Sequence, residues 1–497
     1  MYALGYDIGS SSIKASLVNL EDNSVVKTAQ YPQVEMRIDS PKPGWAEQNP
    51  ESWWIYVVEA TRILLKDQPE NVVSEIGGIG ISYQMHGLVL TDKNGEVLRP
   101  SIIWCDSRAI KSGEEARDIL GRDHCLAKML NEPGNFTASK FKWVHDHEPD
   151  IYQKTDKLML PGDYLGYKLT GEITTTPSGL SEGILWDFEN SKPAEFAFNA
   201  FGIKKSMIPK VVSTFSKQGF VTKIAAAELG IPEGIPLCYR AGDQPNNAMA
   251  LGALKPGELA ATGGTSGVVY GVMDKMVVDS QSRINSFAHV NYTPENKMTG
   301  ALLCINGAGS MYRWTRQIAA GQNVSYNEME AQAAKVPIGS ENLVILPFGN
   351  GAERMLTNHD HGAHIINIDF NRHQQAHIYR ATLEGIAFSF VYGTKILEES
   401  GVKPTTIKAG NDNLFQSEIF SATIATLLNC TIELIETTGA VGAAKAVGYT
   451  LGVKSNLEEA MKGNLSDRII SPDPTKKEAY QEAYSNWKKQ LEQTLNI

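Results

Sequence analysis

Two short segments of small residues, each lying between apolar runs, constrain the fold of this chain more than any other feature. The first unit spans residues 2–20 and turns at residues 9–12; the second spans residues 258–272 and turns at residues 263–267. Apolar runs of this length on either side of a glycine-containing turn predict β-hairpins. The two hairpins resemble each other in turn chemistry, so an internal duplication is one reading of the chain.

The length of 497 residues exceeds what one hydrophobic core normally serves, and predicts two domains with a cleft between them. A turn-rich break at residues 232–236 divides the chain, and we expect domains at 1–235 and 236–497. Strands alternate with helices, which is typical of an α/β fold. Further strands are predicted at 76–82, 88–91, 102–104 and 343–348, and helices at 49–64, 138–145, 374–398 and 415–428, with an exposed terminal helix at 476–494.

Charge and cysteine content exclude several classes of function. The net charge of −10 and the pI near 5.6 argue against a broad nucleic-acid or acidic-membrane surface. The five cysteines are scattered and lack the Cys-x-x-Cys spacing of a zinc site, which fits a reducing compartment. No apolar stretch has the length of a membrane span. We therefore expect a cytoplasmic protein with small-molecule ligands.

The first turn combines a carboxylate with a site for an anion. Small residues let backbone amides approach a phosphate closely, and the serine hydroxyls add hydrogen-bond donors. A carboxylate beside such a turn, here Asp7, can hold Mg²⁺. An ordinary hairpin with a polar turn is the alternative. The second turn has the same combination of small residues and hydroxyl groups. Neither turn has the sequence of a P-loop or of a dinucleotide-binding motif. The candidate phosphate-binding residues are Gly9, Ser10, Ser11, Ser12, Lys14, Gly264 and Thr265.

Asp243 is the candidate general base. It follows Gly242 at the end of an apolar run, about twenty residues before the second turn. Phosphoryl transfer to an alcohol needs a group that accepts the hydroxyl proton, and a carboxylate suffices. Gly-Asp pairs are also common in ordinary turns, so the assignment depends on the neighbouring motifs.

Two polar clusters, residues 84–87 and 104–108, follow predicted strands in the first half. Ligand sites of α/β proteins lie where strands pass into loops, and these side chains offer donors, acceptors and an aromatic face to a polyol. A core histidine and a helix-start Asp-Arg pair are the structural alternatives. The candidate sugar ligands are Met85, His86, Trp104, Asp106 and Arg108, with Gln244 beside the candidate base.

These motifs, in this order, resemble the FGGY family of carbohydrate kinases over essentially the whole chain, and within it the xylulose kinases. The segments that carry the resemblance are residues 7–12, 44–48, 84–87, 104–108, 137–143, 242–243 and 264–267. The resemblance implies an actin-like ATPase (ribonuclease H-like) fold with two domains around a central cleft. It also implies ATP and Mg²⁺ as cofactors, with Asp7 and Asp243 near the metal and Thr265 at the γ-phosphate. Asp243 would be the base that accepts the hydroxyl proton as ATP phosphorylates D-xylulose.

The adenosine segment departs from the family pattern. Ala409 stands where a glycine is expected, and the predicted adenosine contacts fall on Gly410 and Asn411. Cys105 also departs from the xylulose kinase pattern, so a kinase for ribulose or a deoxyketose is an alternative. A non-catalytic sugar-binding or regulatory protein and an actin-like structural ATPase are further alternatives. A homodimer is one option for the oligomeric state.

Overall fold

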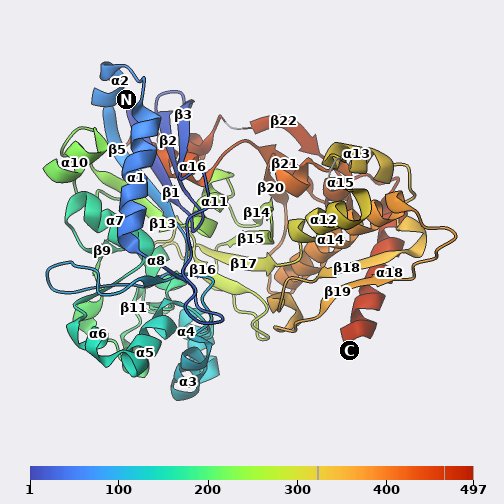
Figure 1. The fold of residues 1–497 in the computed structure, drawn as a ribbon, viewed down its shortest axis with the longest axis horizontal. Coiled ribbons are helices and arrows are strands. Elements are labelled where there is room, and N and C mark those ends of the chain that lie inside the picture. The colour runs from blue at the N-terminus through green and yellow to red at the C-terminus, as the bar shows by residue number, and fades with distance from the viewer. Residues whose placement is uncertain (322–323, 464, 496–497) are drawn as a thin grey trace.

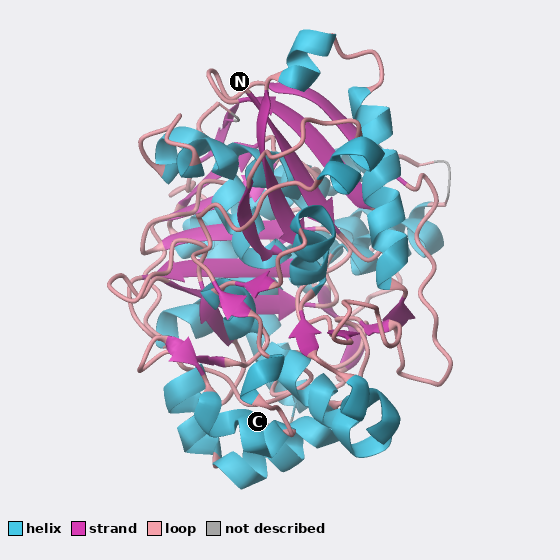
Figure 2. Cartoon of the chain, turned by 90° about the vertical axis from the view of Figure 1, so that its left-hand side faces the viewer, coloured by secondary structure: helices cyan, strands magenta, loops and turns pink. Residues whose placement is uncertain are grey.

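The computed structural model describes residues 1–321, 324–463 and 465–495 and arranges them in two lobes (Figure 1). We call the lobe around the N-terminal hairpin the first lobe and the lobe around residues 258–272 the second lobe. Each is built on its own mixed sheet with helices packed against it. Figure 2, which views the molecule from the side of the first lobe, shows strands in the upper half and a group of helices at the opposite end. The predicted two-domain α/β architecture is confirmed.

The sheet of the first lobe has the order β13-β5-β1-β2-β3. The predicted hairpin forms its centre, because β1 pairs antiparallel with β2 and parallel with β5. The edge strand β13 pairs parallel with β5. It lies after the predicted division at residue 235, so residues from both sides of that division build this sheet. The strands are β1 (Tyr2–Ile8), β2 (Ile13–Asn19), β3 (Val25–Tyr31), β5 (Ile76–Tyr83) and β13 (Leu237–Gly242).

The sheet of the second lobe repeats this arrangement and adds a strand at each edge. Its order is β16-β17-β15-β14-β20-β21-β22. The hairpin β14–β15 is antiparallel, β14 runs parallel to β20, and β20 runs parallel to β21. The five central strands therefore match the first sheet in order and direction. The strands are β14 (Glu258–Gly263), β15 (Gly267–Met273), β16 (Asn285–Ala288), β17 (Thr299–Ile305), β20 (Thr406–Gly410), β21 (Thr431–Ile435) and β22 (Leu465–Ile470).

Two helices connect the lobes. Helix α11 (Asp243–Ala250) follows β13, and α16 (Gly439–Thr450) follows β21 and returns to cover the first sheet. Gly5 and Gly80 allow this approach, because a Cβ at either position would collide with backbone carbonyls of α16. α11 and α16 also pack against each other. The carboxyl ends of strands from both sheets therefore meet around these two helices.

Local sequence explains the first long helix, α1 (Pro50–Leu65). The Asn49 side chain accepts a hydrogen bond from the Glu51 amide, and Pro50 occupies the first turn, as predicted. No helix of the described residues is long and apolar enough to cross a membrane. The other helices of the first half are α2 (Glu70–Ser74), α3 (Ile110–Leu120), α4 (Arg122–Met129), α5 (Thr137–His147), α6 (Pro149–Lys154), α7 (Pro161–Thr170), α8 (Pro177–Glu182), α9 (Phe198–Phe201) and α10 (Lys223–Leu229).

Short strand pairs and a second set of helices complete the fold. The predicted strand at 343–348 is confirmed as β18, which pairs with β19. The short strands are β4 (Glu47–Gln48), β6 (Val89–Thr91), β7 (Ser101–Ile102), β8 (Lys157–Met159), β9 (Thr174–Thr175), β10 (Trp186–Asp187), β11 (Lys192–Pro193), β12 (Lys210–Val211), β18 (Val344–Phe348) and β19 (Gly362–Ile366). The remaining helices are α12 (Gly309–Thr315), α13 (Tyr326–Ala333), α14 (Gln375–Glu399), α15 (Glu418–Leu428), α17 (Leu457–Met461) and α18 (Lys477–Leu495).

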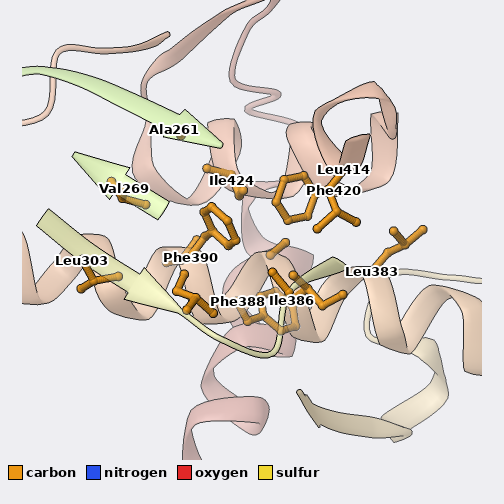
Figure 3. Packing of buried hydrophobic residues seen from close by; sticks show 14 of the residues in the cluster. Ala261, Val269, Leu303, Leu383, Ile386, Phe388, Phe390, Leu414, Phe420 and Ile424 are labelled. Carbon is orange, nitrogen blue, oxygen red and sulfur yellow. The ribbon is translucent and has the colours of Figure 1, made fainter. Parts of the chain in front are cut away.

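The core of the second lobe lies between its sheet and the helices α14 and α15. Figure 3 shows Phe390 of α14 and Phe420 of α15 packed side by side in this core. The terminal helix α18 closes the same core, which corrects the prediction of an exposed helix. Trp487 on α18 is 1% exposed, and its indole nitrogen donates a hydrogen bond to the Ile345 carbonyl. Four apolar or aromatic residues on one face of α18 are buried, at the spacing of helical turns.

Candidate active site

The first turn and Asp7 lie together at the carboxyl end of β1. The Gly9 amide donates a hydrogen bond to the Ser12 carbonyl at 3.1 Å, which closes the turn. The Ser82 hydroxyl donates to the Asp7 carboxylate at 2.9 Å, and Lys14 lies directly across the hairpin from Asp7. Burial raises the pKa of Asp7, whereas the Ser82 hydrogen bond and the Lys14 charge lower it.

Asp7 packs against the start of α16. A Cβ on Gly439, the first residue of that helix, would lie 2.7 Å from the Asp7 carboxyl carbon. The absence of a side chain at Gly439 therefore makes room for the carboxylate. The N-terminus of a helix favours a negative charge nearby, because its first amides point toward that charge. The structure thus holds Asp7 between β1 and a helix that belongs to the far end of the sequence.

Asp243 is the first residue of α11 and lies directly after β13. Its side chain is partly exposed. Its pKa is raised from 3.8 to about 7, chiefly by burial and then by the negative charge of Asp7, while hydrogen bonds with Gln244 act in the opposite direction. The two predicted carboxylates are therefore close enough to repel each other, although 236 residues separate them in the sequence. Such a pair can take up a proton or share a cation.

His86 is held in one protonation state beside this pair. Its Nδ1 lies 2.9 Å from the Glu182 carbonyl oxygen, so Nδ1 carries the proton and donates it to that oxygen. Burial and the positive charges of Lys140 and Arg354 lower its pKa to about 3. The imidazole is therefore neutral, and its Nε2 has a lone pair that can accept a hydrogen bond.

Gly242, the residue before Asp243, packs against the segment that contains His86. A Cβ at Gly242 would lie 2.6 Å from the Met85 side chain and would collide with the Glu182 carboxylate. Glu182 was not predicted from the sequence, where it is one acid in an ordinary loop. It is 1% exposed, and its carboxylate lies beside the Tyr83 hydroxyl. Burial raises its pKa well above 4.5, and the charge of Asp243 raises it further.

The second predicted sugar cluster divides into one exposed and two buried side chains. Trp104 is 52% exposed, and its indole nitrogen donates a hydrogen bond to Ser10 at 3.2 Å. The Asp106 carboxylate accepts hydrogen bonds from the Ala46 amide and from Arg108, each at 2.6 Å. Arg108 also pairs with Glu47 at 2.7 Å. Asp106 and Arg108 therefore bond within the lobe, and direct sugar contact by these two residues stays a prediction.

Lys140 of α5 links the two sugar clusters and was also missed. Its ammonium donates to the His86 carbonyl at 2.8 Å and to the Ile103 carbonyl at 3.0 Å. Burial lowers the pKa of Lys140 to about 7, although the charge of Asp106 opposes this shift. Lys140 lies in the segment 137–143 that carries the family resemblance, but its burial, which marks it as a contact of both clusters, is not visible in a single sequence. Lys140 fixes the backbone on both sides of the sugar-facing surface.

The second turn forms one end of a cavity of about 370 Å³ in the second lobe. The Gly309 amide donates to the Gly264 carbonyl and the Ser310 amide to the Thr265 carbonyl, each at 3.0 Å. The turn is therefore held directly on the start of α12. The other lining residues include two stacked tyrosines with ring centroids 5.1 Å apart. The cavity is lined by Gly263, Gly264, Thr265, Gly309, Ser310, Tyr312, Arg313, Tyr326, Asn327, Glu330, Asn413, Leu414, Gln416 and Ser417.

The predicted adenosine contacts lie next to this cavity without lining it. Gly410 ends β20, and the Asn411 amide donates to the Ile435 carbonyl at 3.1 Å. The cavity wall is formed instead by residues 413–417, two to six positions further along. The substitution at Ala409 therefore lies within a buried strand rather than on the cavity surface. A role for Gly410 and Asn411 in nucleotide binding stays a prediction.

The residues present fit a nucleotide with a bound divalent cation. In the part of the chain that the structure describes, no cluster of three or more His, Cys, Asp or Glu side chains could hold a metal alone. Mg²⁺ commonly binds to one or two carboxylates and takes its other ligands from phosphates and water. Asp7 and Asp243 offer such a pair, and their mutual repulsion would be relieved by a cation. The glycine-rich turn and the aromatic cavity suit a phosphate chain and a base.

Two domain models of one protein family match this chain. The N-terminal domain of the FGGY family of carbohydrate kinases matches residues 2–251, and the C-terminal domain of that family matches residues 259–451. The chain is similar to a xylulose kinase from Lactococcus lactis, with 28% identity over 511 residues that cover 100% of this chain and 97% of the relative.

Solved structures show the same fold. A xylulose kinase from Rhodospirillum rubrum superimposes with a TM-score of 0.91 at 27% identity, covering 100% of this chain and 99% of that one. A gluconate kinase from Lactobacillus acidophilus superimposes with a TM-score of 0.90 at 20% identity, covering 99% and 98%. The predicted actin-like fold of two domains is confirmed.

Proposed function

Because the chain belongs to the FGGY family of carbohydrate kinases, we propose that it transfers the γ-phosphoryl group of ATP to D-xylulose and forms D-xylulose 5-phosphate. Phosphorylation of a sugar by ATP follows from family membership. The choice of D-xylulose rests on relatives named xylulose kinase and on the segment that contains Met85 and His86. The observation that carries the proposal is the pair Asp7 and Asp243, at the strand ends beside the sugar-facing residues.

In this proposal Asp243 is the general base. As the terminal hydroxyl oxygen of the sugar attacks the γ-phosphorus, the bond to the bridging oxygen of ADP breaks and the hydroxyl proton moves to the Asp243 carboxylate. The raised pKa of about 7 matches this role, since a base that titrates near the working pH can both accept and release a proton. Gln244 orients the carboxylate through its hydrogen bonds.

Asp7 would hold Mg²⁺ with Asp243, and the metal would neutralise charge on the phosphate chain. The amides and hydroxyls of residues 9–12 would bind phosphate from the first lobe, and Gly264 and Thr265 would bind it from the second. Lys14 adds a positive charge opposite Asp7. The cavity between Tyr312, Tyr326 and residues 413–417 would take the adenosine end.

The sugar would lie on the first lobe between His86, Met85 and Trp104. The neutral His86 can accept a hydrogen bond from a sugar hydroxyl through Nε2, because its Nδ1 proton is bound to Glu182. Trp104 offers an aromatic face next to Ser10, which places the sugar end and the phosphate end of the first lobe in contact. The fixed geometry of these groups would set the orientation of the reactive hydroxyl.

A coupled ADP-release assay over a panel of sugars tests the choice of substrate. We expect kcat/KM for D-xylulose to exceed that for ribulose, deoxyketoses and gluconate by at least about 10-fold, a difference of roughly 1.4 kcal/mol. A higher kcat/KM for one of these sugars would reassign the substrate without changing the reaction class.

Another ketose is the second candidate, and Cys105 is the observation that favours it. Its thiol is exposed next to Trp104, where it can touch a bound sugar. The conservative variant Cys105→Ser separates the two candidates. A changed order of sugars in the panel would identify Cys105 as a contact, whereas an unchanged order would remove the reason for the second candidate.

A further inference from the structure

The proposed reaction assigns no role to Arg354, a charged residue of the second lobe that follows β18. It begins the short 3₁₀ helix η5 (Arg354–Leu356), which packs against β17. Its guanidinium interacts electrostatically with Cys304, near the end of β17. In the sheet Cys304 pairs with Val268, and the next residue pairs with Gly267, the last residue of the second turn. Arg354 is therefore close to the phosphate-binding end of the second lobe.

The same guanidinium also faces the first lobe. Its positive charge contributes to the lowered pKa of His86, the candidate sugar ligand. The thiol of Cys304 responds to the charges of Arg354, Glu353 and Asp243 together. A neighbouring charge shifts a pKa most strongly from within about 4–6 Å. Arg354 is thus near the candidate sugar ligand His86, and Cys304 is near both Arg354 and the candidate base.

Within the described residues the charge of Arg354 is poorly compensated. No carboxylate of the described residues lies within 4 Å of it, and the one hydrogen bond that these residues form with it runs from Nη1 to the Ser282 carbonyl at 3.3 Å. The acid that acts on it, Glu132, is already bonded to Arg122 and to the Ser282 hydroxyl. Arg354 is mostly buried, and burial lowers its pKa. A guanidinium has five donors, and a buried charge normally has a partner.

The preceding residue makes the position of Arg354 rigid. The Glu353 carboxylate accepts hydrogen bonds from the Asn306 amide at 2.9 Å and from the Gly307 amide at 3.2 Å. These amides belong to the loop that leads into α12, whose first residues bind the second turn. Arg354 is therefore attached to the same rigid unit as the candidate phosphate-binding turn.

We propose that Arg354 is a catalytic residue: its guanidinium binds the phosphoryl group as that group passes from ATP to the sugar, and then holds the phosphate of the product. The inference rests on the proposed function. Arg354 forms no covalent bond and gives up no proton, because the hydroxyl proton goes to Asp243. The planar, forked guanidinium can donate hydrogen bonds to two phosphate oxygens at once. Its positive charge would offset the negative charge that the phosphates bring to a site that already holds two carboxylates.

Kinetics of Arg354→Met and Arg354→Lys test the proposal. We expect kcat to fall by about 10³-fold in Arg354→Met, with a KM for the sugar within about 3-fold of the original value. Lysine keeps the charge without the fork and should give an intermediate loss. In Arg354→Ala, free guanidinium ion should restore part of kcat. The matched control is Arg372→Met, which removes an exposed arginine of the same lobe and should leave kcat unchanged.

Stability and phosphate binding separate this role from a structural one. Because an unpaired buried charge costs stability, Arg354→Met should melt at the same temperature as the original protein or higher. Millimolar inorganic phosphate should raise the melting temperature of the original protein and not that of Arg354→Met. Near-normal kcat in Arg354→Met, or equal stabilisation of both proteins by phosphate, would overturn the proposal. If the original protein phosphorylates no sugar, the proposed function fails, whereas the difference in phosphate binding still decides whether Arg354 is an anion site.

Discussion

The two lobes share a strand order but place different chemistry at the ends of equivalent strands. In the first lobe β1 and β13 lead into carboxylates, Asp7 and Asp243. In the second lobe the equivalent strands β14 and β21 lead into Gly263 and a segment before Gly439. The common topology brings these ends to one region, and residue type then decides what each lobe can bind. In the proposed function the first lobe would supply acids for the metal and the sugar, and the second would supply small and aromatic residues for the nucleotide.

The helices that follow β13 and β21 show the same contrast. α11 begins with Asp243, whereas α16 begins with Gly439, against which Asp7 packs. The two helices are packed together, and the Asn246 side chain of α11 donates to the Gly439 carbonyl at 3.0 Å. One helix therefore carries the candidate base, and the other positions the carboxylate that acts on this base.

Removing the acid of α11 should have the largest effect. We expect Asp243→Asn to lower kcat by about 10³-fold or more, because the sugar hydroxyl loses its proton acceptor. Calorimetry should show a sugar Kd within about 3-fold of the original value, since asparagine keeps the shape of the side chain. A variant with near-normal kcat would show that the base is another group.

Adding a side chain at the start of α16 should have the next largest effect. In Gly439→Ala the new methyl group would displace the Asp7 carboxylate, and we expect kcat to fall about 10²-fold with a raised requirement for Mg²⁺. The matched control is Gly448→Ala in the same helix, where the nearest atom to the new methyl group is a leucine carbon at 3.3 Å. Equal losses in both variants would indicate general damage to α16.

The pKa of Asp243 makes activity depend on pH. The group must be ionised to accept a proton, and its pKa in the folded protein is raised to about 7. We therefore expect kcat/KM to fall about 10-fold per pH unit below 7 and to level off above it. Asp7→Asn should shift this midpoint downward, because the charge of Asp7 raises the pKa of Asp243. A midpoint near 4 in the original protein would contradict both the burial of Asp243 and its proximity to Asp7.

A change in the second turn should have the smallest effect and should act on the nucleotide alone. A Cβ at Gly264 meets no atom closer than 3.7 Å, so Gly264→Ala should fold normally. The methyl group would hinder the close approach of a phosphate, and we expect the KM for ATP to rise about 5-fold, the cost of one weakened hydrogen bond. A larger change in the KM for the sugar than for ATP would break the assignment of the two lobes.

The sequence was most informative where chemistry depends on neighbouring residues. The two hairpins, the cap of α1 and the order of the candidate motifs all follow from short segments, and the structure confirms the hairpins and the cap. The buried side of α18 was missed, because the polar residues between its apolar positions resemble those of a solvent-exposed helix.

Long-range packing set the limits of prediction for the site. Glu182 and Lys140 reach the site from helices distant in sequence, and their burial, which reveals their role, is not visible in the sequence. The role of Gly439 depends on α16 returning to the first sheet, a contact between residues 432 positions apart. The cavity residues near 413–417 could likewise not be predicted. They line the cavity because of how η6 (Asn413–Gln416) packs, and no sequence motif marks them.

The most direct test of the account is ADP release by the original protein with and without D-xylulose. If the two lobes act only together, ADP release should require the sugar, rise by at least about 100-fold on its addition, and yield one sugar phosphate for each ADP. ADP release at the same rate without sugar, or ADP formed with no sugar phosphate, would contradict the division of roles between the lobes.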